Sequence, residues 1–560
     1  MEDNERTYLL INYDIGATGN LDNIRSRYPN LVFTEISPGY YTIQVPQGQD
    51  VEFERLNNEL DFVVFPLAYG LNAQEALEIS NISVFHNYPY GELRGTGVLV
   101  GFVDTGIAYT NSLFQNADGT SRISRIWDQT IQGDGSSAFG YGTVYTIEDI
   151  NRALQSAEPY SVVPSRDENG HGTYLAGITA GNDQSDAASY IGGAPDASIM
   201  MVKLRPANQS VRNFYLIEDD EPVYQSNDIL TGIEFLIREA YSMNMPLVIC
   251  LGLGNNFGAH NGSDILERYL ERISAIDNVI VVTAAGNEGN SAHHYRGNIT
   301  TGGTDNVEIN VGNNERGFLL FLWAALPNRI QIALRTPLGE TVDRVPIINN
   351  QDQRYSFNLE QSRVTVRYLY PEPFTGTEAI VVRIEDPTPG IWTIIVSGEF
   401  IVSGEYHIWL SRTNFISEET RFLNPDPNVT VQIPGTGSYS LVVGAYNDQD
   451  DSVYVASGRG PTTFNVIKPD IIAPGVNVLG PTPGGGFTSY TGTSAAAAVT
   501  ASACALLLQW ATIEGKYPYM NTPIARGILT RGARRQREVT YPNNIEGYGR
   551  LDLQNSLNTL

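Results

Sequence analysis

The 560-residue sequence has only two cysteines, Cys250 and Cys504. Two cysteines cannot form the disulfide framework that staples small secreted domains, and a chain of this length can bury a core without one. Each cysteine lies in an apolar run, LVICLGL and SACALLL respectively. We therefore expect both to be buried free thiols.

Basic residues are also scarce. The sequence has 35 lysines and arginines but 62 aspartates and glutamates, which gives a net charge of −27. Such a charge repels nucleic acid and anionic membranes, so neither is expected as a partner. The start, MEDNERTYLLINY, lacks the basic and long apolar regions of a secretory signal. No window approaches the ~18 consecutive apolar residues of a membrane-spanning helix. The sequence predicts a soluble protein made in the cytosol without a signal peptide.

The hydrophobic pattern divides the chain into four segments. Residues 8–66 alternate short strands and helices, and from Gly97 near-continuous apolar strands such as VLVGFVDTG alternate with helical stretches, which is typical of an α/β core with a parallel sheet. Residues 304–412 show only short alternating strands and predict an inserted all-β sandwich. The predicted organisation is an α+β module at 1–75, the first part of the α/β domain at 76–300, the sandwich at 301–428 and the second part of the α/β domain at 429–560.

Three short motifs occur in an order that suits nucleophilic catalysis. Asp104 ends an apolar strand in VDTG, His171 opens a helix in NGHGT, and Ser494 opens the alanine-rich helix in YTGTSAAAAVT. A serine hydroxyl needs an imidazole to take its proton, and the imidazole needs a carboxylate to fix its tautomer. Asn287, in AAGNEGN just past another core strand, could donate to an oxyanion together with the backbone N–H of Ser494.

Each of these motifs has an ordinary structural explanation when taken alone. The aspartate could simply end a strand, the histidine could be structural, and Ser494 could begin a helix that only packs in the core. The three in this order, each on the expected local element, favour catalysis. The interpretation of YTGTSAAAAVT is therefore that its helix packs and that Ser494 at its start is the nucleophile.

The segments VDTGI, NGHGTYLAG, AAGNEGN and GTSAAAA resemble the four signatures of the subtilisin-like serine proteases, and IKPDIIAPGV and GYGRLDLQNSL resemble two more segments of that fold. The resemblance implies a catalytic triad of Asp104, His171 and Ser494 and an oxyanion residue, Asn287. It also implies that Gly252-Leu253-Gly254 is the edge strand that pairs with the substrate backbone. We name no metal ligand and expect no cofactor.

The sequence departs from the family pattern beside the nucleophile. The family usually has Met after the serine, where this chain has Ala495, and Pro and His where it has Ala498 and Val499. Gly252 replaces the usual serine of the edge strand. None of these changes removes a reacting group, and alanine is the best helix former, so we expect the helix and the chemistry to persist.

The wider architecture resembles the Csp germination proteases of clostridial spores, most of all the CspB type, which keeps its triad. Asn287 and Ser494 lie 207 residues apart, and the predicted sandwich fills this interval. The expected fold is α/β: a subtilisin-like parallel-sheet protease domain with an N-terminal α+β propeptide and an inserted jelly-roll-like sandwich.

This narrower resemblance implies a serine endopeptidase that activates the precursor of a spore cortex-lytic hydrolase by limited proteolysis during germination. It also implies location in the cortex or coat region of the spore, self-cleavage near residues 70–78, and a propeptide that stays bound without a covalent link. Two alternatives remain: an intracellular degradative subtilisin and a non-catalytic pseudoprotease regulator.

Overall fold

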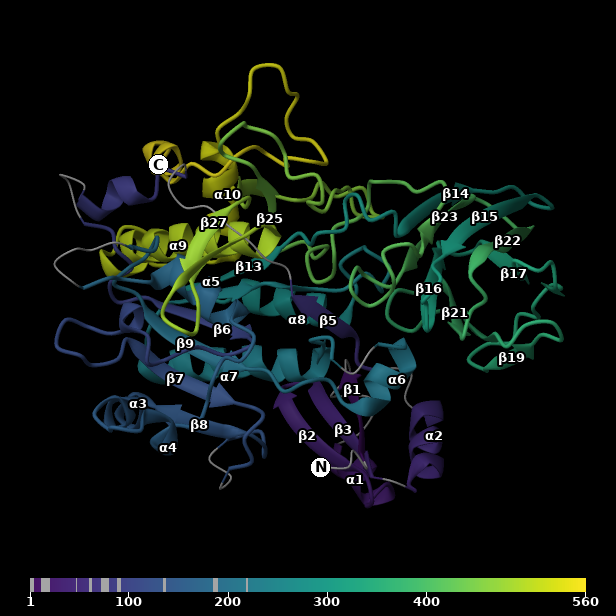
Figure 1. Ribbon diagram of the computed structural model, residues 1–560, viewed down its shortest axis with the longest axis horizontal. Coiled ribbons are helices and arrows are strands. Elements are labelled where there is room, and N and C mark those ends of the chain that lie inside the picture. The colour runs from purple at the N-terminus through teal and green to yellow at the C-terminus, as the bar shows by residue number, and fades with distance from the viewer. Residues whose placement is uncertain are drawn as a thin grey trace.

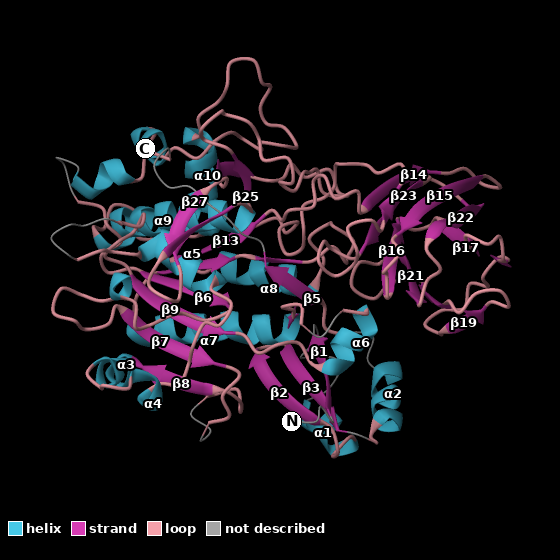
Figure 2. Ribbon diagram, in the orientation of Figure 1, coloured by secondary structure: helices cyan, strands magenta, loops and turns pink. Residues whose placement is uncertain are grey.

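The computed structural model describes residues 5–11, 21–46, 48–59, 63–71, 80–87, 92–133, 137–184, 190–217 and 220–560. Figure 1 shows a large α/β body, an N-terminal module beneath it in purple, and a β-rich region at one side in teal and green. Helices and strands alternate in the α/β body, whereas strands and loops make up the region at the side (Figure 2).

The N-terminal module is a four-stranded antiparallel sheet, in the order β2-β3-β1-β4, with two helices. Its elements are β1 (Glu5–Ile11), α1 (Leu21–Arg27), β2 (Val32–Ser37), β3 (Tyr40–Pro46), α2 (Asp50–Glu59) and β4 (Val63–Val64). This strand and helix order confirms the α+β prediction. One face of the sheet packs against α1 and α2. The other face, through Leu9, Ile36 and Tyr40, joins the core beneath helices α7 (Ser226–Met243) and α8 (Ile265–Ser274).

The α/β body is built on an eight-stranded sheet that is parallel except for the edge strand β8. In spatial order its strands are β26 (Ile471–Pro474), β25 (Leu441–Tyr446), β13 (Val279–Ala284), β11 (Leu247–Leu251), β6 (Leu99–Asp104), β9 (Ser198–Lys203), β7 (Ile123–Asp128) and β8 (Thr143–Thr146). Both faces are covered, because Val100 and Phe102 of β6 enter one core and Leu99 and Val103 enter the other. Double burial explains why these strands are apolar without alternation.

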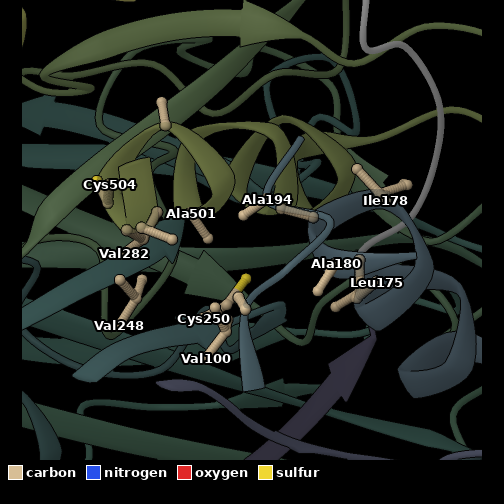
Figure 3. Packing of buried hydrophobic residues seen from close by; sticks show 14 of the residues in the cluster. Val100, Leu175, Ile178, Ala180, Ala194, Val248, Cys250, Val282, Ala501 and Cys504 are labelled. Atoms are coloured by element: carbon tan, nitrogen blue, oxygen red, sulfur yellow. The ribbon is translucent and has the colours of Figure 1, made fainter. Parts of the chain in front are cut away.

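Helices α5 (His171–Ala180) and α9 (Thr493–Leu508) cover one face of this sheet, and α7 and α8 cover the other. Figure 3 shows Ala501 and Cys504 of α9 above Val282, Val248 and Cys250. Both cysteines are free and buried, as predicted.

Helix α9 and the π-helical turn that follows it are the one described segment, Thr493–Ile513, that is long and apolar enough to cross a membrane. The sequence prediction concerned about 18 consecutive apolar residues, and the threonines and serines of this segment interrupt any such run. Within the protein, 83% of its most apolar window is buried. A helix that is buried against a sheet can be as apolar as a membrane-spanning helix, so length and composition alone do not distinguish the two.

The β-rich region consists of two antiparallel sheets that share one core. The first sheet is β14 (His294–Asn298), β23 (Glu405–Leu410), β16 (Gly317–Ala324), β21 (Glu378–Glu385), β20 (Arg363–Leu369) and β19 (Gln353–Ser356). The second is β18 (Thr341–Val342), β17 (Arg329–Arg335), β22 (Gly390–Phe400), β15 (Thr304–Val311) and β24 (Arg421–Phe422). Because both sheets bury one face against the other, the region is a β-sandwich.

The sandwich begins earlier than the predicted boundary at residue 301. Strand β14 pairs with β23 along its whole length, from His294 opposite Trp409 to Asn298 opposite Glu405. Its sequence, HYRGN, has no apolar alternation, so the pattern gave no strand signal there.

Short elements complete the fold. They are η1 (Ser83–Asn87), η2 (Ser112–Phe114), α3 (Ile147–Leu154), α4 (Pro159–Val162), α6 (Gln209–Tyr215), α10 (Thr522–Gly532), α11 (Leu553–Asn558), β27 (Val478–Pro481) and β28 (Phe487–Tyr490). A separate small sheet holds β5 (Ala68–Leu71) between β10 (Tyr224–Gln225) and β12 (Leu253–Gly254). The chain thus runs from the N-terminal module directly to the carboxyl edge of the large sheet.

Candidate active site

The three predicted reacting residues meet at the carboxyl edge of the parallel sheet, where α/β folds place their sites. Asp104 is the last residue of β6, His171 is the first residue of α5, and Ser494 is the second residue of α9. Their side chains are 1%, 4% and 0% exposed. Asp104 and His171 are 67 positions apart in the sequence and His171 and Ser494 are 323 apart, yet each pair is in direct contact.

The contacts form a continuous relay from carboxylate to hydroxyl. His171 Nδ1 lies 2.8 Å from Asp104 Oδ1 and 2.9 Å from Oδ2, and His171 Nε2 lies 3.2 Å from Ser494 Oγ. A carboxylate accepts only from a protonated Nδ1, so in the neutral imidazole the lone pair of Nε2 is directed at the serine hydroxyl. Nε2 is placed to take the hydroxyl proton as Oγ attacks a carbonyl carbon.

Asn287 lies beside the start of α9, as the oxyanion prediction requires. Its Oδ1 accepts hydrogen bonds from Thr493 N at 3.0 Å and from Thr493 Oγ1 at 3.1 Å. Since the carboxamide oxygen is engaged, the Nδ2 group faces the opposite side as a donor. The Ser494 N–H belongs to the first turn of α9, where backbone donors have no intrahelical partner. These two donors can stabilise the negative oxygen of a tetrahedral intermediate.

The predicted substrate strand is occupied by the chain itself. Leu253 and Gly254 of β12 pair antiparallel with Leu71 and Gly70 of β5. The third predicted residue, Gly252, lies against the triad: a Cβ built there would fall 2.9 Å from Ser494 Cβ and 3.0 Å from His171 Cε1. An extended peptide beside β12 therefore runs along the nucleophile.

Comparison with known proteins agrees with this geometry. The Peptidase S8 subtilase family model matches residues 95–367 and 413–549. The chain belongs to the subtilase family. The structure of the Clostridium perfringens CspB protease is similar, with a TM-score of 0.75 and 32% identity over 85% of this chain and 97% of that one.

Curated subtilases of other organisms match at lower identity. Subtilisin-like protease SBT3.3 of Arabidopsis thaliana is 23% identical over 512 residues, which cover 81% of this chain and 62% of that protein. Serine protease AprX of Bacillus subtilis is 29% identical over 148 residues, or 23% of this chain and 32% of AprX. The chain thus spans about three fifths of the plant relative and about a third of AprX.

Asp167 is a buried carboxylate of this subtilase site that the sequence interpretation missed. Its Oδ1 accepts from Thr105 Oγ1 at 2.8 Å and Gly170 N at 2.7 Å, and its Oδ2 accepts from Thr173 N at 2.9 Å and Thr173 Oγ1 at 2.7 Å. These bonds tie the turn after Asp104 to the start of the His171 helix. An acidic residue just before a helix is a known start signal and could have revealed it.

Glu288, next to Asn287, is a second missed residue. Its Oε2 accepts from Asn256 Nδ2 at 2.9 Å, Ser291 Oγ at 2.8 Å and His293 Nδ1 at 2.7 Å, and its Oε1 accepts from Thr413 N at 3.0 Å. Burial alone raises the pKa of this carboxyl, but His293 and the other donors outweigh burial and lower the pKa to about 2. The ionised side chain ties the oxyanion loop to the residue just before β14 and to the segment that follows β23.

Arg412 makes the matching connection to the substrate strand. It follows β23, the last strand of the first sandwich sheet, and its Nη1 donates to Gly254 O at 2.9 Å. The insert is thus anchored to both walls of the cleft, through Glu288 on one side and Arg412 on the other. Neither link carries a signal in the linear sequence, because each joins residues more than 120 positions apart.

The unusual residues after Ser494 pack without altering the triad. Ala495, Ala498 and Val499 are buried in the core that α9 shares with the sheet. Among the described residues there is no group of three histidine, cysteine, aspartate or glutamate side chains that could hold a metal ion.

Proposed function

We propose that this chain is a serine endopeptidase in which Asp104, His171 and Ser494 act as one unit. The observation that carries the proposal is the unbroken relay of 2.8 Å and 3.2 Å contacts through His171. His171 takes the proton of Ser494 as Oγ attacks the peptide carbonyl, and later gives it to the leaving amine. Asn287 Nδ2 and the Ser494 N–H hold the oxyanion, and water releases the acyl group by the reverse sequence.

We further propose that residues 1–75 are a propeptide that folds with the enzyme, is cut by it and stays bound. The support is β5, which pairs with the substrate strand while the module's sheet packs on α7 and α8. The predicted cut lies within residues 70–78; of these, 72–78 lie outside the described residues. Because β5 occupies the substrate strand β12, it has to leave before another substrate enters.

The proposed substrate is the precursor of a spore cortex-lytic hydrolase, activated by one limited cut during germination. The support is the Csp-like order of segments and the similarity to the CspB protease over 85% of the chain. A bound propeptide and a sandwich anchored beside the cleft both narrow access, which favours an exposed loop of a docked partner. The corresponding location is the cortex or coat region of the spore, with no nucleic acid or membrane as partner.

A direct comparison of substrates tests this role. The purified protein is mixed at equal concentration with a cortex-lytic zymogen and with casein, alongside the Ser494→Ala variant. One discrete zymogen product and slow casein loss support the proposal, with no product from the variant. Rapid casein digestion with an intact zymogen would identify a degradative subtilase, and an inert wild-type protein would identify a regulator.

The same samples test the propeptide. Intact mass measurement of the wild-type protein should give two fragments that co-purify, and of Ser494→Ala a single uncut chain. Two fragments from the variant would mean that another protease makes the cut.

A further inference from the structure

A large cavity of about 1550 Å³ lies between the N-terminal module, α6, the loop after β12 and the outward face of the sandwich. In Figure 1, α6 lies between α2 of the module and strands β16 and β21. Pockets for small molecules have volumes of roughly 300–1,000 Å³. The size of this cavity suits a segment of polypeptide.

The chain itself shows how a polypeptide runs from this cavity into the cleft. Phe65 and Leu67 line the cavity, and the next four residues, Ala68–Leu71, form the strand that pairs with β12. A substrate that replaces β5 in the same register has its upstream residues in the same cavity. Pairing with β12 therefore fixes the path of the substrate backbone. The substrate residue that takes the place of Phe65 lies five residues before the one that pairs with Gly254.

Outside the N-terminal module, Phe65 contacts two aromatic side chains, and two more lie behind these. Its ring lies 4.9 Å from that of Phe214 and 6.3 Å from that of Tyr215. Behind them, Tyr215 stacks on Phe257 at 5.6 Å, and Phe257 lies 4.5 Å from Phe321. Phe214 and Tyr215 belong to α6, Phe257 follows β12, and Phe321 belongs to β16 of the sandwich.

This cluster is not a closed piece of core. Phe65, Phe214 and Phe321 are only partly buried, and all three line the cavity. On β16, alternation places Phe321 on the outward face while Leu320 and Leu322 fill the sandwich core. Aromatic pairs at these ring separations attract beyond simple burial. The sandwich thus contributes one wall of an aromatic surface that opens toward the substrate path.

We propose that Phe214, Tyr215, Phe257 and Phe321 form a binding site for an aromatic side chain located five residues before the substrate residue that pairs with Gly254. In this structure the site is filled by Phe65, which belongs to the segment 65–71 at the end of the N-terminal module, here called the tail. A protein substrate fills the site after the tail has left. The inference rests on the proposed peptidase function and deepens it, because the insert then selects substrates by a residue remote from the cut.

The first test measures how fast a fluorophosphonate probe labels the nucleophile of the full chain. Phe65→Ala should speed labelling by about 10-fold, because the tail loses its aromatic anchor and vacates the cleft more often, while Phe65→Tyr should label at the wild-type rate. The matched control is Phe400→Ala, an exposed aromatic residue of the second sandwich sheet. Equal rates in Phe65→Ala, Phe400→Ala and wild type would overturn the inference.

The second test keeps the fold constant and changes only the ligand. A peptide with the sequence of residues 63–71 is added to Phe65→Ala, together with a second peptide that has alanine in place of the phenylalanine. The first peptide should slow labelling at about a 10-fold lower concentration, and Phe65→Ala/Phe214→Ala should abolish the difference. Two equally effective peptides would contradict the proposal.

Failure of the proposed function gives a different result. If no variant is labelled at Ser494 under any condition, the nucleophile is not activated and the peptidase proposal fails. If Ser494 is labelled in all variants at one rate, the peptidase proposal stands and the aromatic site is wrong.

Discussion

Replacing Glu288 by glutamine removes one buried charge and leaves a side chain of nearly the same shape. The pKa of Glu288 is lowered from 4.5 to about 2 in the folded protein. Each pKa unit is worth about 1.4 kcal/mol, so the ionised carboxylate contributes on the order of 3 kcal/mol of stability at neutral pH. The NH₂ of the glutamine also takes the place of one carboxylate oxygen, so it faces either the donor Thr413 N–H or the group of donors that includes His293.

The sign of the pH dependence follows from the direction of this shift. A carboxyl with a lowered folded-state pKa stabilises the fold above its unfolded pKa, and the contribution is lost as pH falls through the folded value. Urea unfolding should therefore show Glu288→Gln about 3 kcal/mol less stable than wild type at pH 7. The difference should shrink as pH falls from 4.5 toward 2. A variant as stable as wild type at pH 7, or a difference that grows on acidification, would refute this reasoning.

Two further substitutions probe the supports of the triad. Asp167→Ala leaves the buried N–H groups of Gly170 and Thr173 without an acceptor, so it should lower the free energy of unfolding in urea by roughly 3 kcal/mol or more, and also lower kcat. Unchanged stability would argue against a role for Asp167 in holding the two catalytic segments together. Gly252→Ala places a Cβ 2.9 Å from the Cβ of Ser494, and overpacking of this kind typically costs about 1–3 kcal/mol. We expect kcat for a short ester substrate to fall by roughly 10-fold or more as the triad shifts, whereas wild-type kcat would show that the site has room.

The sequence was enough to predict the α/β core and the three side chains that meet at its carboxyl edge, because their signals are local. Asp104 ends an unbroken apolar strand, and a glycine caps the start of each of the two helices that carry His171 and Ser494. Parallel strands bring their carboxyl ends to one edge, so the topology brings such residues together once the strand order is fixed.

The links between the insert and the cleft could not be predicted in the same way. Arg412 and Glu288 are ordinary charged residues in the sequence, and their roles appear only when the sandwich is placed beside the sheet. The start of the sandwich was missed because β14 is paired through its backbone and has no apolar alternation. The apolar length of α9 likewise reflects burial between a sheet and another helix, which depends on tertiary packing.

The most direct test of the central claim is to locate the adduct that a fluorophosphonate forms on the protein. Peptide mapping by mass spectrometry after prolonged incubation should find one adduct per chain, on Ser494. The rate should fall by about 10² to 10⁴ in His171→Ala, because the general base is lost. An adduct on another serine, or an unchanged rate on Ser494 without His171, would contradict the assignment of Asp104, His171 and Ser494 as one catalytic unit.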